Sequence, residues 1–473
     1  MTYQNIRFIA YTLDTMPKVD SNGKESYLGV AAPAGSPHTV DIDARCALML
    51  RAIQTAAAQL PASSPPQPAG GELNVFMAPE FFFRGPLGAY SMDEVQLLIN
   101  RMQTMVAAPE WSDWLFVFGS IVGFSAPTYD MPPYAIDPGK PREAFNFTLT
   151  QQGGPEHVGA IGAKVVMKEL QSSCDFIAAL GVAGAQLVSN VTYVDAGASG
   201  AGREQQQLAY DGAGVFECAD ITWGVEICLD HYNNSDGYGR LQRSPQLPGE
   251  QQIQVQLVPS GGMRIQELQT MAMPGGYVFN CDGQNGGSAT LKRVDAIGSP
   301  PTHALADIAA LATYAVDGGP LALADASPPP APISIDELYA RGAGSIIVFA
   351  PVVIPAPATV PGYLLQLNWQ ASNAYQFNFQ LVYDAQGAFV TALCQIRSTR
   401  KNFGDRSYFL PLHMQTRDVA NADIRFHINI VPGPSGDSSF VRCQIDTPQF
   451  RADGFCLEFK AAYAGQDSCI VSW

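Results

Sequence analysis

The sequence predicts a layered α/β domain followed by a smaller all-β domain. Up to about residue 350, apolar runs rich in β-branched and aromatic residues alternate with segments of helical composition. The segment PVVIPAPATVPG, residues 351–362, has the composition of a linker. Beyond it, short strand-like runs separated by Gly, Asp, Asn and Pro indicate a sandwich or small barrel. We therefore expect domains over residues 1–358 and 359–473.

The strands expected in the first domain are short runs without helical periodicity. They are 5–13, 73–79, 114–124, 144–150, 158–170, 214–220, 221–230, 253–262, 276–287 and 344–351. Helices are expected at 40–60, where acidic residues near the start suit a helix N-terminus, and near 91–108 and 264–273. We interpret the remaining long segments as insertions, at 15–38, 126–142, 180–210, 233–250 and 287–340.

The charge balance argues against nucleic-acid and membrane partners. The chain of 473 residues has a net charge of −16, and no cluster of Lys and Arg offsets this locally, so phosphate backbones and anionic lipids would be repelled. No apolar run approaches the ~20 residues that span a bilayer, and the start lacks the pattern of a secretion signal. We expect a cytoplasmic protein.

The cysteines and histidines give no sign of a metal or disulfide framework. Nine cysteines form no CxxC pair, and most are expected to be small buried apolar residues. The six histidines show no paired spacing of metal ligands. The sequence therefore implies neither a metal nor any other cofactor.

Three segments each place one reactive side chain beside an apolar strand. Glu80 follows LNVFMAP, Lys168 lies in KVVMKEL, and Cys228 lies in WGVEICLD. Taken singly, each has an ordinary explanation as a loop carboxylate, a strand-end lysine or a buried cysteine. A thiol with a pKa near ~8.5 needs a base before it can attack carbon, and a carboxylate desolvated by Phe81–Phe83 would suit that task.

In their order along the chain, and at the spacings of positions 80, 168 and 228, the three residues resemble the Glu, Lys and Cys catalytic set of the nitrilase, or carbon-nitrogen hydrolase, superfamily. The resemblance covers most of residues 5–358, including the segments NFTLT, VPSGG and GAGSIIVFAP. It implies an α-β-β-α sandwich that pairs into at least a homodimer. It also implies that Lys168 and the backbone N–H of Leu229 stabilise an oxyanion, with Glu80 as base and Cys228 as nucleophile. The C-terminal β domain is one that most relatives lack.

Further candidates surround this set. Asp230 follows the cysteine by two residues, as an acidic residue does in many relatives, and favours an amide substrate over a nitrile. Asp175 stands at the offset of a second carboxylate found in some amidase relatives, although its surroundings differ. Asn146 could bind substrate or brace the Glu80 loop, and Arg84 could do the same. Cys174 is a weaker alternative nucleophile because it lacks the strand-end pattern.

The predicted function is hydrolysis of a non-peptide C–N bond in a small amide, through a thioester on Cys228. Three alternatives stay open: nitrile hydrolysis through a thioimidate, acyl or amidino transfer to another nucleophile, and a non-catalytic binding protein on the same frame. The sequence does not name the substrate. It also leaves the β domain open between oligomerisation, lid formation and partner binding.

Overall fold

The computed structural model describes most of the first 360 residues and the strands that follow them. The described residues are 3–19, 25–33, 37–60, 71–126, 143–170, 172, 186–187, 212–232, 239–243, 246, 249–297, 303–323 and 331–360, with strands between 363 and 472. The chain divides into two compact units, Met1–Leu241 with Ile253–Pro357, and Gln242–Gln252 with Ala358–Trp473.

The first unit contains a large mixed sheet in the order β17-β18-β1-β4-β6-β8-β7-β5. These strands are β1 (Tyr3–Thr12), β4 (Gly71–Met77), β5 (Tyr90–Ser91), β6 (Trp114–Val117), β7 (Ile121–Ser125), β8 (Glu143–Gln152), β17 (Ala310–Ala315) and β18 (Ser345–Phe349). Strands β9 (Ala163–Met167) and β10 (Gln186–Leu187) pair with β8, and β19 (Val352–Val353) pairs with β1. Strands β1, β4 and β6 are parallel, so their carboxyl ends meet at one edge.

The second sheet has the order β11-β12-β13-β14-β15-β16. Its strands are β11 (Val215–Cys218), β12 (Ile221–Val225), β13 (Val255–Ser260), β14 (Tyr277–Asp282), β15 (Ser288–Ile297) and β16 (His303–Ile308). The central strands β12, β13 and β14 are parallel. A small separate hairpin pairs β2 (Lys18–Val19) with β3 (Glu25–Ser26).

An apolar core fills the space between the two sheets. Phe8 and Val75 of the first sheet and Trp223, Leu257 and Phe279 of the second belong to one buried cluster. The rings of Phe8 and Phe279 have centroids 5.0 Å apart. The sheets therefore pack face to face as a sandwich.

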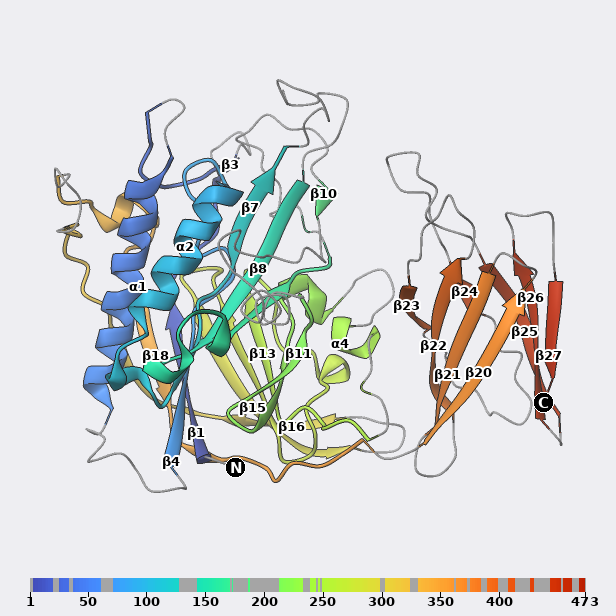
Figure 1. The fold of residues 1–473 in the computed structure, drawn as a ribbon. Helices are drawn as coiled ribbons and strands as arrows, with labels where there is room; N and C mark the ends of the chain where they lie inside the picture. The colour runs from blue at the N-terminus through green and yellow to red at the C-terminus, as the bar shows by residue number, and fades with distance from the viewer. Residues whose placement is uncertain are drawn as a thin grey trace. The chain divides into compact units, whose positions relative to one another are not determined.

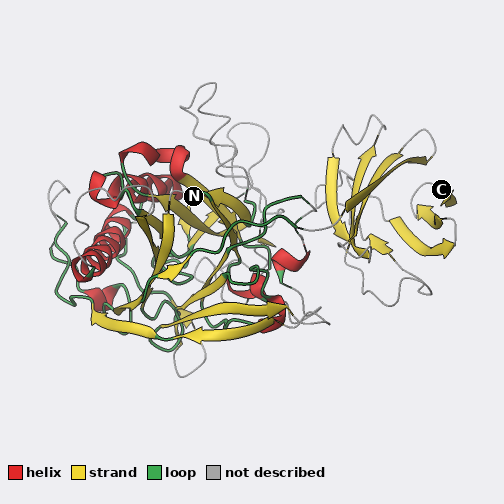
Figure 2. Cartoon of the chain, turned by 90° about the horizontal axis from the view of Figure 1, so that it is seen from below, coloured by secondary structure: helices red, strands yellow, loops and turns green. Residues whose placement is uncertain are grey.

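Two helices cover the outer face of the first sheet. Helix α1 (Thr39–Gln59) and helix α2 (Met92–Met105) lie side by side beside it (Figure 1). In the view from below, the longest helices lie at the margin of the first unit and strands fill its centre (Figure 2). Ser91 and Glu94 form a capping box at the start of α2. Both helices agree with the expectation from sequence.

In the described part of the chain, the outer face of the second sheet carries short helical segments. Among the described residues it carries the four-residue helix α4 (Arg240–Arg243) and a 3₁₀ turn, η7 (Glu267–Gln269). The helix predicted over 264–273 is therefore wrong. Backbone N–H groups in this stretch donate to buried side chains: that of Gln266 to His231 and that of Met271 to Gln256. The N–H of Met271 is thereby lost to a regular helix, in which it would donate to the carbonyl four residues earlier.

Two further expectations need correction. Residues 288–297 and 303–315 are not part of an insertion, because they contain β15 and β16 of the second sheet and β17 of the first. Their Ala-, Thr- and Asp-rich composition resembles a loop, and long-range strand pairing decides their structure. The single strand expected over 114–124 is two strands, β6 and β7, separated where Gly119 adopts φ +74°.

The described residues of the second unit after position 362 form two antiparallel sheets. The first contains β20 (Tyr363–Ala371), β21 (Tyr375–Tyr383), β22 (Phe389–Ser398) and β23 (Ser407–Leu412). The second contains β24 (Phe426–Ile428), β25 (Cys443–Arg451), β26 (Gly454–Ala461) and β27 (Ser468–Ser472).

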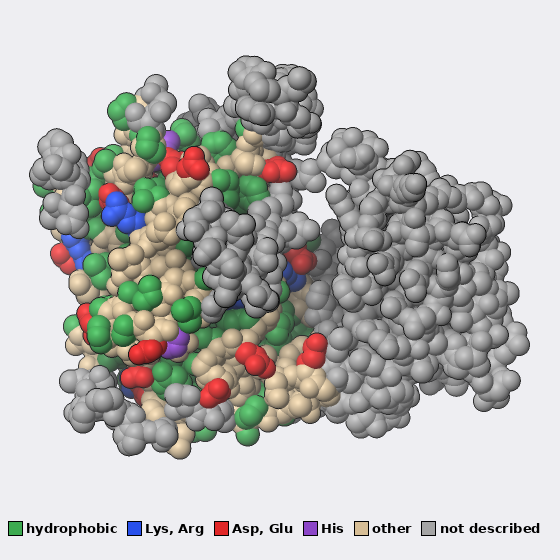
Figure 3. All heavy atoms as spheres, viewed as in Figure 1, with side chains coloured by type: hydrophobic (Ala, Val, Ile, Leu, Met, Phe, Trp, Pro, Cys, Tyr) green, Lys and Arg blue, Asp and Glu red, His purple; other side chains and the backbone are tan. Residues whose placement is uncertain are grey.

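One face of the described part of the chain is sparsely charged (Figure 3). On the face shown in Figure 3, acidic side chains are spread among apolar and neutral ones and outnumber the basic side chains. Within the described part of the chain, no helix is both long and apolar enough to cross a membrane.

Candidate active site

Three strand ends bring Glu80, Lys168 and Cys228 together. Glu80 follows β4, Lys168 follows β9, and Cys228 begins a 3₁₀ turn, η6 (Cys228–His231), just after β12. Lys168 Nζ lies 2.8 Å from Glu80 Oε1, and both residues have 0% of their surface exposed. Cys228 is 8% exposed. The site therefore combines side chains from both sheets in a nearly dry environment.

The Cys228 thiol lies against both of the other residues. It hydrogen-bonds to the Glu80 carboxylate and to the backbone N–H of Gly261, and Lys168 is close enough to act on its charge. Burial raises the pKa of this thiol well above its ordinary value, and the negative charge of Glu80 adds to this. Lys168 and the N–H of Gly261 oppose the increase. The resting thiol is therefore protonated, beside a carboxylate that can accept its proton.

The backbone at the site is strained in two places. Cys228 has φ +49° and Phe81, the residue after Glu80, has φ +64°. A non-glycine residue in this left-handed region costs about 1–2 kcal/mol. Strain of this kind is maintained only where the surrounding structure fixes the conformation, and here it occurs next to the candidate base and at the candidate nucleophile.

The side chain of Glu80 accepts several hydrogen bonds. Asn146 Nδ2 donates to Oε1 at 2.9 Å, the same oxygen that Lys168 contacts, and the N–H of Gly261 donates to Oε2 at 3.0 Å. The hydroxyl of Thr15 donates to the Glu80 carbonyl at 2.6 Å and fixes the backbone. Asn146, expected from sequence to bind substrate or brace the loop, thus contacts the candidate base.

Asp230 connects the cysteine turn to the lysine loop. Its carboxylate accepts the backbone N–H groups of Glu169, at 3.0 Å, and Leu170, at 2.8 Å, and lies 3.9 Å from Arg240 Nη1. Burial raises the pKa of Asp230 to about 7, while Arg240 and the backbone N–H groups oppose that increase. Asp230 therefore holds the residues after Lys168 against the turn that carries Cys228.

The other predicted residues have different positions. Leu229 follows Cys228 in η6, and the first N–H groups of a helical turn have no acceptor inside it, so its N–H suits an oxyanion donor. The Arg84 guanidinium is buried and stacks 4.4 Å from both the Tyr27 and the Phe81 ring centres, which indicates a bracing role. Asp175 and Cys174 lie outside the described residues.

Sequence reasoning missed Gly261 and a buried network around Glu226 and His231. Gly261 directly follows β13, in the motif Ser-Gly-Gly, which could have indicated a backbone donor at a strand end. Glu226 is a charged residue inside an otherwise apolar strand segment two positions before the cysteine, and this was the available signal.

A small apolar cluster borders the site. Phe81, Val122 and Ala144 are buried together, with Met16 and Phe124 packed against them and partly exposed. The Phe81 ring centre lies 5.6 Å from Lys168 Nζ. This cluster offers an apolar surface beside the polar triad, the combination found in small-molecule pockets.

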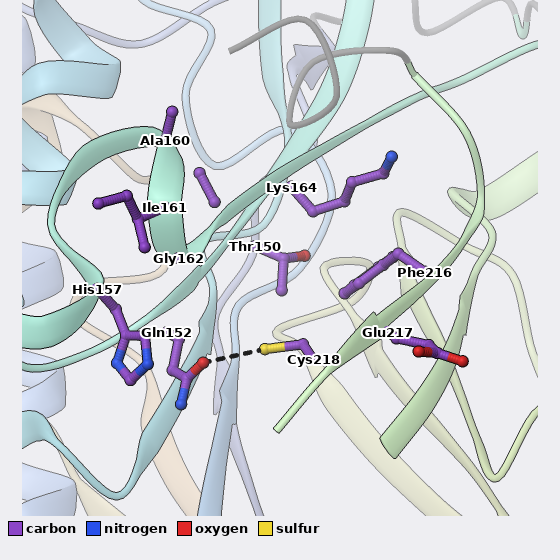
Figure 4. Close-up of a pocket in the computed structure, with 11 residues that line it drawn as sticks. Thr150, Gln152, His157, Ala160, Ile161, Gly162, Lys164, Phe216, Glu217 and Cys218 are labelled. Carbon is purple, nitrogen blue, oxygen red and sulfur yellow. Dashed lines mark hydrogen bonds between the residues drawn. The ribbon is translucent and has the colours of Figure 1, made fainter. Parts of the chain in front are cut away.

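A separate cavity of about 450 Å³ lies at the other end of β9 (Figure 4). Thr150, Gln152, Lys164 and Cys218 are among its lining residues, and the Cys218 thiol donates to Gln152 Oε1 at 3.3 Å. Lys164 precedes Lys168 by four residues, which is ~13 Å along a strand, so this cavity is distinct from the triad. Burial raises the pKa of Cys218 to about 12, which makes it a poor nucleophile.

The described residues contain no group of three or more His, Cys, Asp or Glu side chains arranged to hold a metal ion.

Comparison with known proteins gives weak similarities. No protein-family profile and no curated protein matches the chain. One similar solved structure is glutamine-dependent NAD+ synthetase from Acinetobacter baumannii in complex with ADP, at 12% identity and a TM-score of 0.28. The match covers 60% of this chain and 41% of the synthetase, so the chain spans less than half of that protein.

Another similar structure is a mutant amidase from Nesterenkonia sp. AN1, which shows the result of Michael addition of acrylamide at the active-site cysteine. It has 12% identity and a TM-score of 0.26, and the match covers 73% of this chain and 92% of the amidase. Both TM-scores are too low to define the fold or the activity of this chain. Those conclusions rest on its own residues.

Proposed function

We propose that this protein is a cysteine-dependent carbon-nitrogen hydrolase that converts a small amide into an acid and ammonia or an amine. The single observation that supports this most directly is the buried Glu80 carboxylate, which contacts both Lys168 Nζ and the Cys228 thiol. A base, a cation and a nucleophile from three distant segments are thereby within reach of one carbonyl group.

In the first half of the reaction, Glu80 takes the thiol proton as the sulfur of Cys228 attacks the amide carbon. The tetrahedral oxyanion is stabilised by the Lys168 ammonium and by the backbone N–H of Leu229. As this intermediate collapses, the C–N bond breaks and Glu80 donates its proton to the leaving nitrogen. The products of this half are ammonia or an amine and a thioester on Cys228.

In the second half, Glu80 removes a proton from water, and the resulting hydroxide attacks the thioester carbon. The C–S bond breaks, the acid is released, and Glu80 returns its proton to the sulfur of Cys228. The dry surroundings of the triad strengthen each electrostatic contact in both halves, because solvent does not screen them.

The test is release of ammonia or amine from a panel of primary amides, N-substituted amides, ureido compounds and nitriles. Wild type is compared with Cys228→Ala and with Cys218→Ala, a control at a partly buried cysteine outside the triad. We expect amide-dependent release that is lost in Cys228→Ala and kept in Cys218→Ala. A Cys228→Ala variant that is folded and as active as wild type would overturn the proposal.

The same panel separates the alternative reactions on this triad. Release from nitriles but not from amides would indicate hydrolysis through a thioimidate. Product formation that requires an added amine or thiol would indicate transfer of the acyl or amidino group. If no compound reacts and Cys228 is alkylated by iodoacetamide no faster than the other cysteines, a non-catalytic binding protein becomes the better explanation.

A further inference from the structure

A fully buried pair of side chains, Glu226 and His231, connects the two ends of the chain segment that carries Cys228. Glu226 stands two residues before Cys228 and His231 three residues after it. His231 Nδ1 lies 2.7 Å from Glu226 Oε2. A side-chain contact thus connects the two chain segments that enter and leave the turn.

The hydrogen-bond geometry determines which ring nitrogen of His231 carries the proton. The backbone N–H of Gln266 must donate, and it lies 2.9 Å from Nε2, so Nε2 is the acceptor. The ring proton is therefore on Nδ1 and is donated to Glu226. A neutral imidazole with both nitrogens occupied is positioned as a rigid connector between two segments.

Both carboxylate oxygens of Glu226 also have hydrogen-bond partners. Its Oε2 also accepts from Gln256 Nε2 at 2.7 Å, and its Oε1 accepts from the backbone N–H of Leu241 at 2.7 Å. Its own backbone N–H donates to Leu257 at 3.0 Å. Three side-chain and backbone donors therefore hold the carboxylate. Glu226 is connected to strand β13 twice, once through Gln256 and once through its own backbone N–H.

Strand β13 also ends at the triad. Gln256 belongs to this strand, and Gly261, which follows the strand directly, donates its N–H to Glu80 Oε2. The connector at Glu226 and the candidate base are therefore anchored to the same strand. This arrangement can set the distance between the base and the nucleophile.

We propose that Glu226 and His231 are positioning residues that hold Cys228 in its left-handed conformation, with its thiol directed at Glu80. This proposal rests on the proposed function, in which Cys228 is the nucleophile. Without the connector, Cys228 is expected to relax from φ +49° toward ordinary backbone angles, and the thiol would then leave the reach of Glu80.

The experiment compares His231→Leu with His231→Asn. Leucine removes both hydrogen bonds at similar volume, whereas the asparagine amide can restore the donor to Glu226 from the position of Nδ1. His38→Leu is the matched control, because His38 Nδ1 also contacts a glutamate, Glu94, at 2.8 Å, beside helix α1 and away from the triad. All variants are checked for folding by circular dichroism and thermal unfolding.

Two readouts report on positioning. One is the rate at which iodoacetamide modifies Cys228, measured by peptide mass spectrometry, and the other is kcat and KM on an amide that wild type cleaves. In His231→Leu we expect both the Cys228 alkylation rate and kcat to fall by roughly 10-fold to 100-fold, with KM nearly unchanged. His231→Asn should recover most of both rates, and His38→Leu should match wild type.

The outcomes distinguish the two proposals. An active Cys228→Ala variant would overturn the proposed function, and the positioning proposal with it. Loss of activity in Cys228→Ala, together with wild-type alkylation and kcat in His231→Leu, would overturn the positioning proposal alone. Equal losses in His231→Leu, His231→Asn and His38→Leu would also overturn it, because they would indicate general loosening. If His231→Leu does not fold, Glu226→Gln replaces it, since its amide cannot accept from all of the donors.

Discussion

Lys168 and Glu80 form an ion pair that is closed to solvent on both sides, with Nζ 2.8 Å from Oε1 and neither side chain exposed. Removing two charges from water is costly, and their attraction compensates only when the remaining hydrogen bonds are also satisfied. Here Asn146 and Gly261 supply such bonds to Glu80. Removing one partner would leave the other charge buried and unpaired, so the effect of the pair on stability can be separated from its role in the proposed chemistry.

We first predict a strongly non-additive effect on stability. Lys168→Met leaves the Glu80 charge buried without its cation and should cost about 3–5 kcal/mol of unfolding free energy. The double variant Glu80→Gln, Lys168→Met removes both charges and should recover most of this loss while staying inactive. Denaturant unfolding of wild type, both single variants and the double variant measures the coupling. Simply additive losses would contradict the prediction.

Glu80→Gln should separate catalysis from thiol ionisation. The amide cannot accept the thiol proton, so kcat should fall by about 100-fold to 10,000-fold. The negative charge of Glu80 is one cause of the raised thiol pKa, so its removal should move Cys228 ionisation to lower pH. Activity assays and the pH dependence of iodoacetamide modification measure the two effects.

The exposed substitution Glu156→Gln serves as the control for this experiment and should change neither quantity. A midpoint for Cys228 modification that moves to higher pH in Glu80→Gln would contradict the assigned electrostatics.

Asp230 should make stability depend on pH in a defined window. Its pKa is raised from 3.8 to about 7 by burial, so the folded state holds a proton that the unfolded state has already lost. The contribution of Asp230 to stability is therefore fully present below pH 3.8 and is lost as pH rises through 7. The whole loss is on the order of 4 kcal/mol.

Asp230→Asn removes this titration and keeps one oxygen at the position of Oδ1, which accepts from the N–H groups of both Glu169 and Leu170. Unfolding free energies of wild type and variant, measured from pH 4 to pH 8, should differ increasingly in favour of the variant as pH rises. A constant difference across this range would show that Asp230 does not titrate there.

Gly119→Ala should damage both the fold and the Glu80 loop. Gly119 has φ +74°, and a Cβ there would overlap the backbone carbonyl of Pro79 and lie 3.1 Å from Cβ of Phe82. We expect a loss of several kcal/mol, because strain and a backbone clash add together. Gly159→Ala is the control, since Gly159 has φ +66° with open space around it and should lose only about 1 kcal/mol. Thermal unfolding of the two variants measures the loss of stability in each.

Sequence reasoning found what depends on local pattern. Helices α1 and α2 follow from runs of helix-forming residues, and Glu80, Lys168 and Cys228 were selected because each stands beside a buried strand. The structure places these three side chains in contact. These three side chains meet because of the order of the strands in two sheets. The sequence does not reveal that order by itself, and only the resemblance to a known superfamily suggested it.

The predictions that were wrong concern segments whose partners lie far away in the sequence. Strands β15, β16 and β17 join the outer parts of both sheets, although their residues have weak strand propensity and adjoin a Pro-rich segment. Over 264–273, where a helix was predicted, the N–H of Met271 donates to the side chain of Gln256 instead of to a carbonyl four residues earlier. Gln256 is not near in sequence, so composition could not reveal this contact.

The left-handed backbone at Cys228 implies a trade-off between stability and activity. A glycine at this position would adopt φ +49° freely and would be the least strained replacement. In a cysteine, the β-carbon causes backbone strain at this angle. A library of variants selected for heat resistance alone should therefore drift toward glycine at position 228 and lose the nucleophile. The chain remains reactive only under selection for its chemistry, and position 228 is where the demands of folding and function oppose each other.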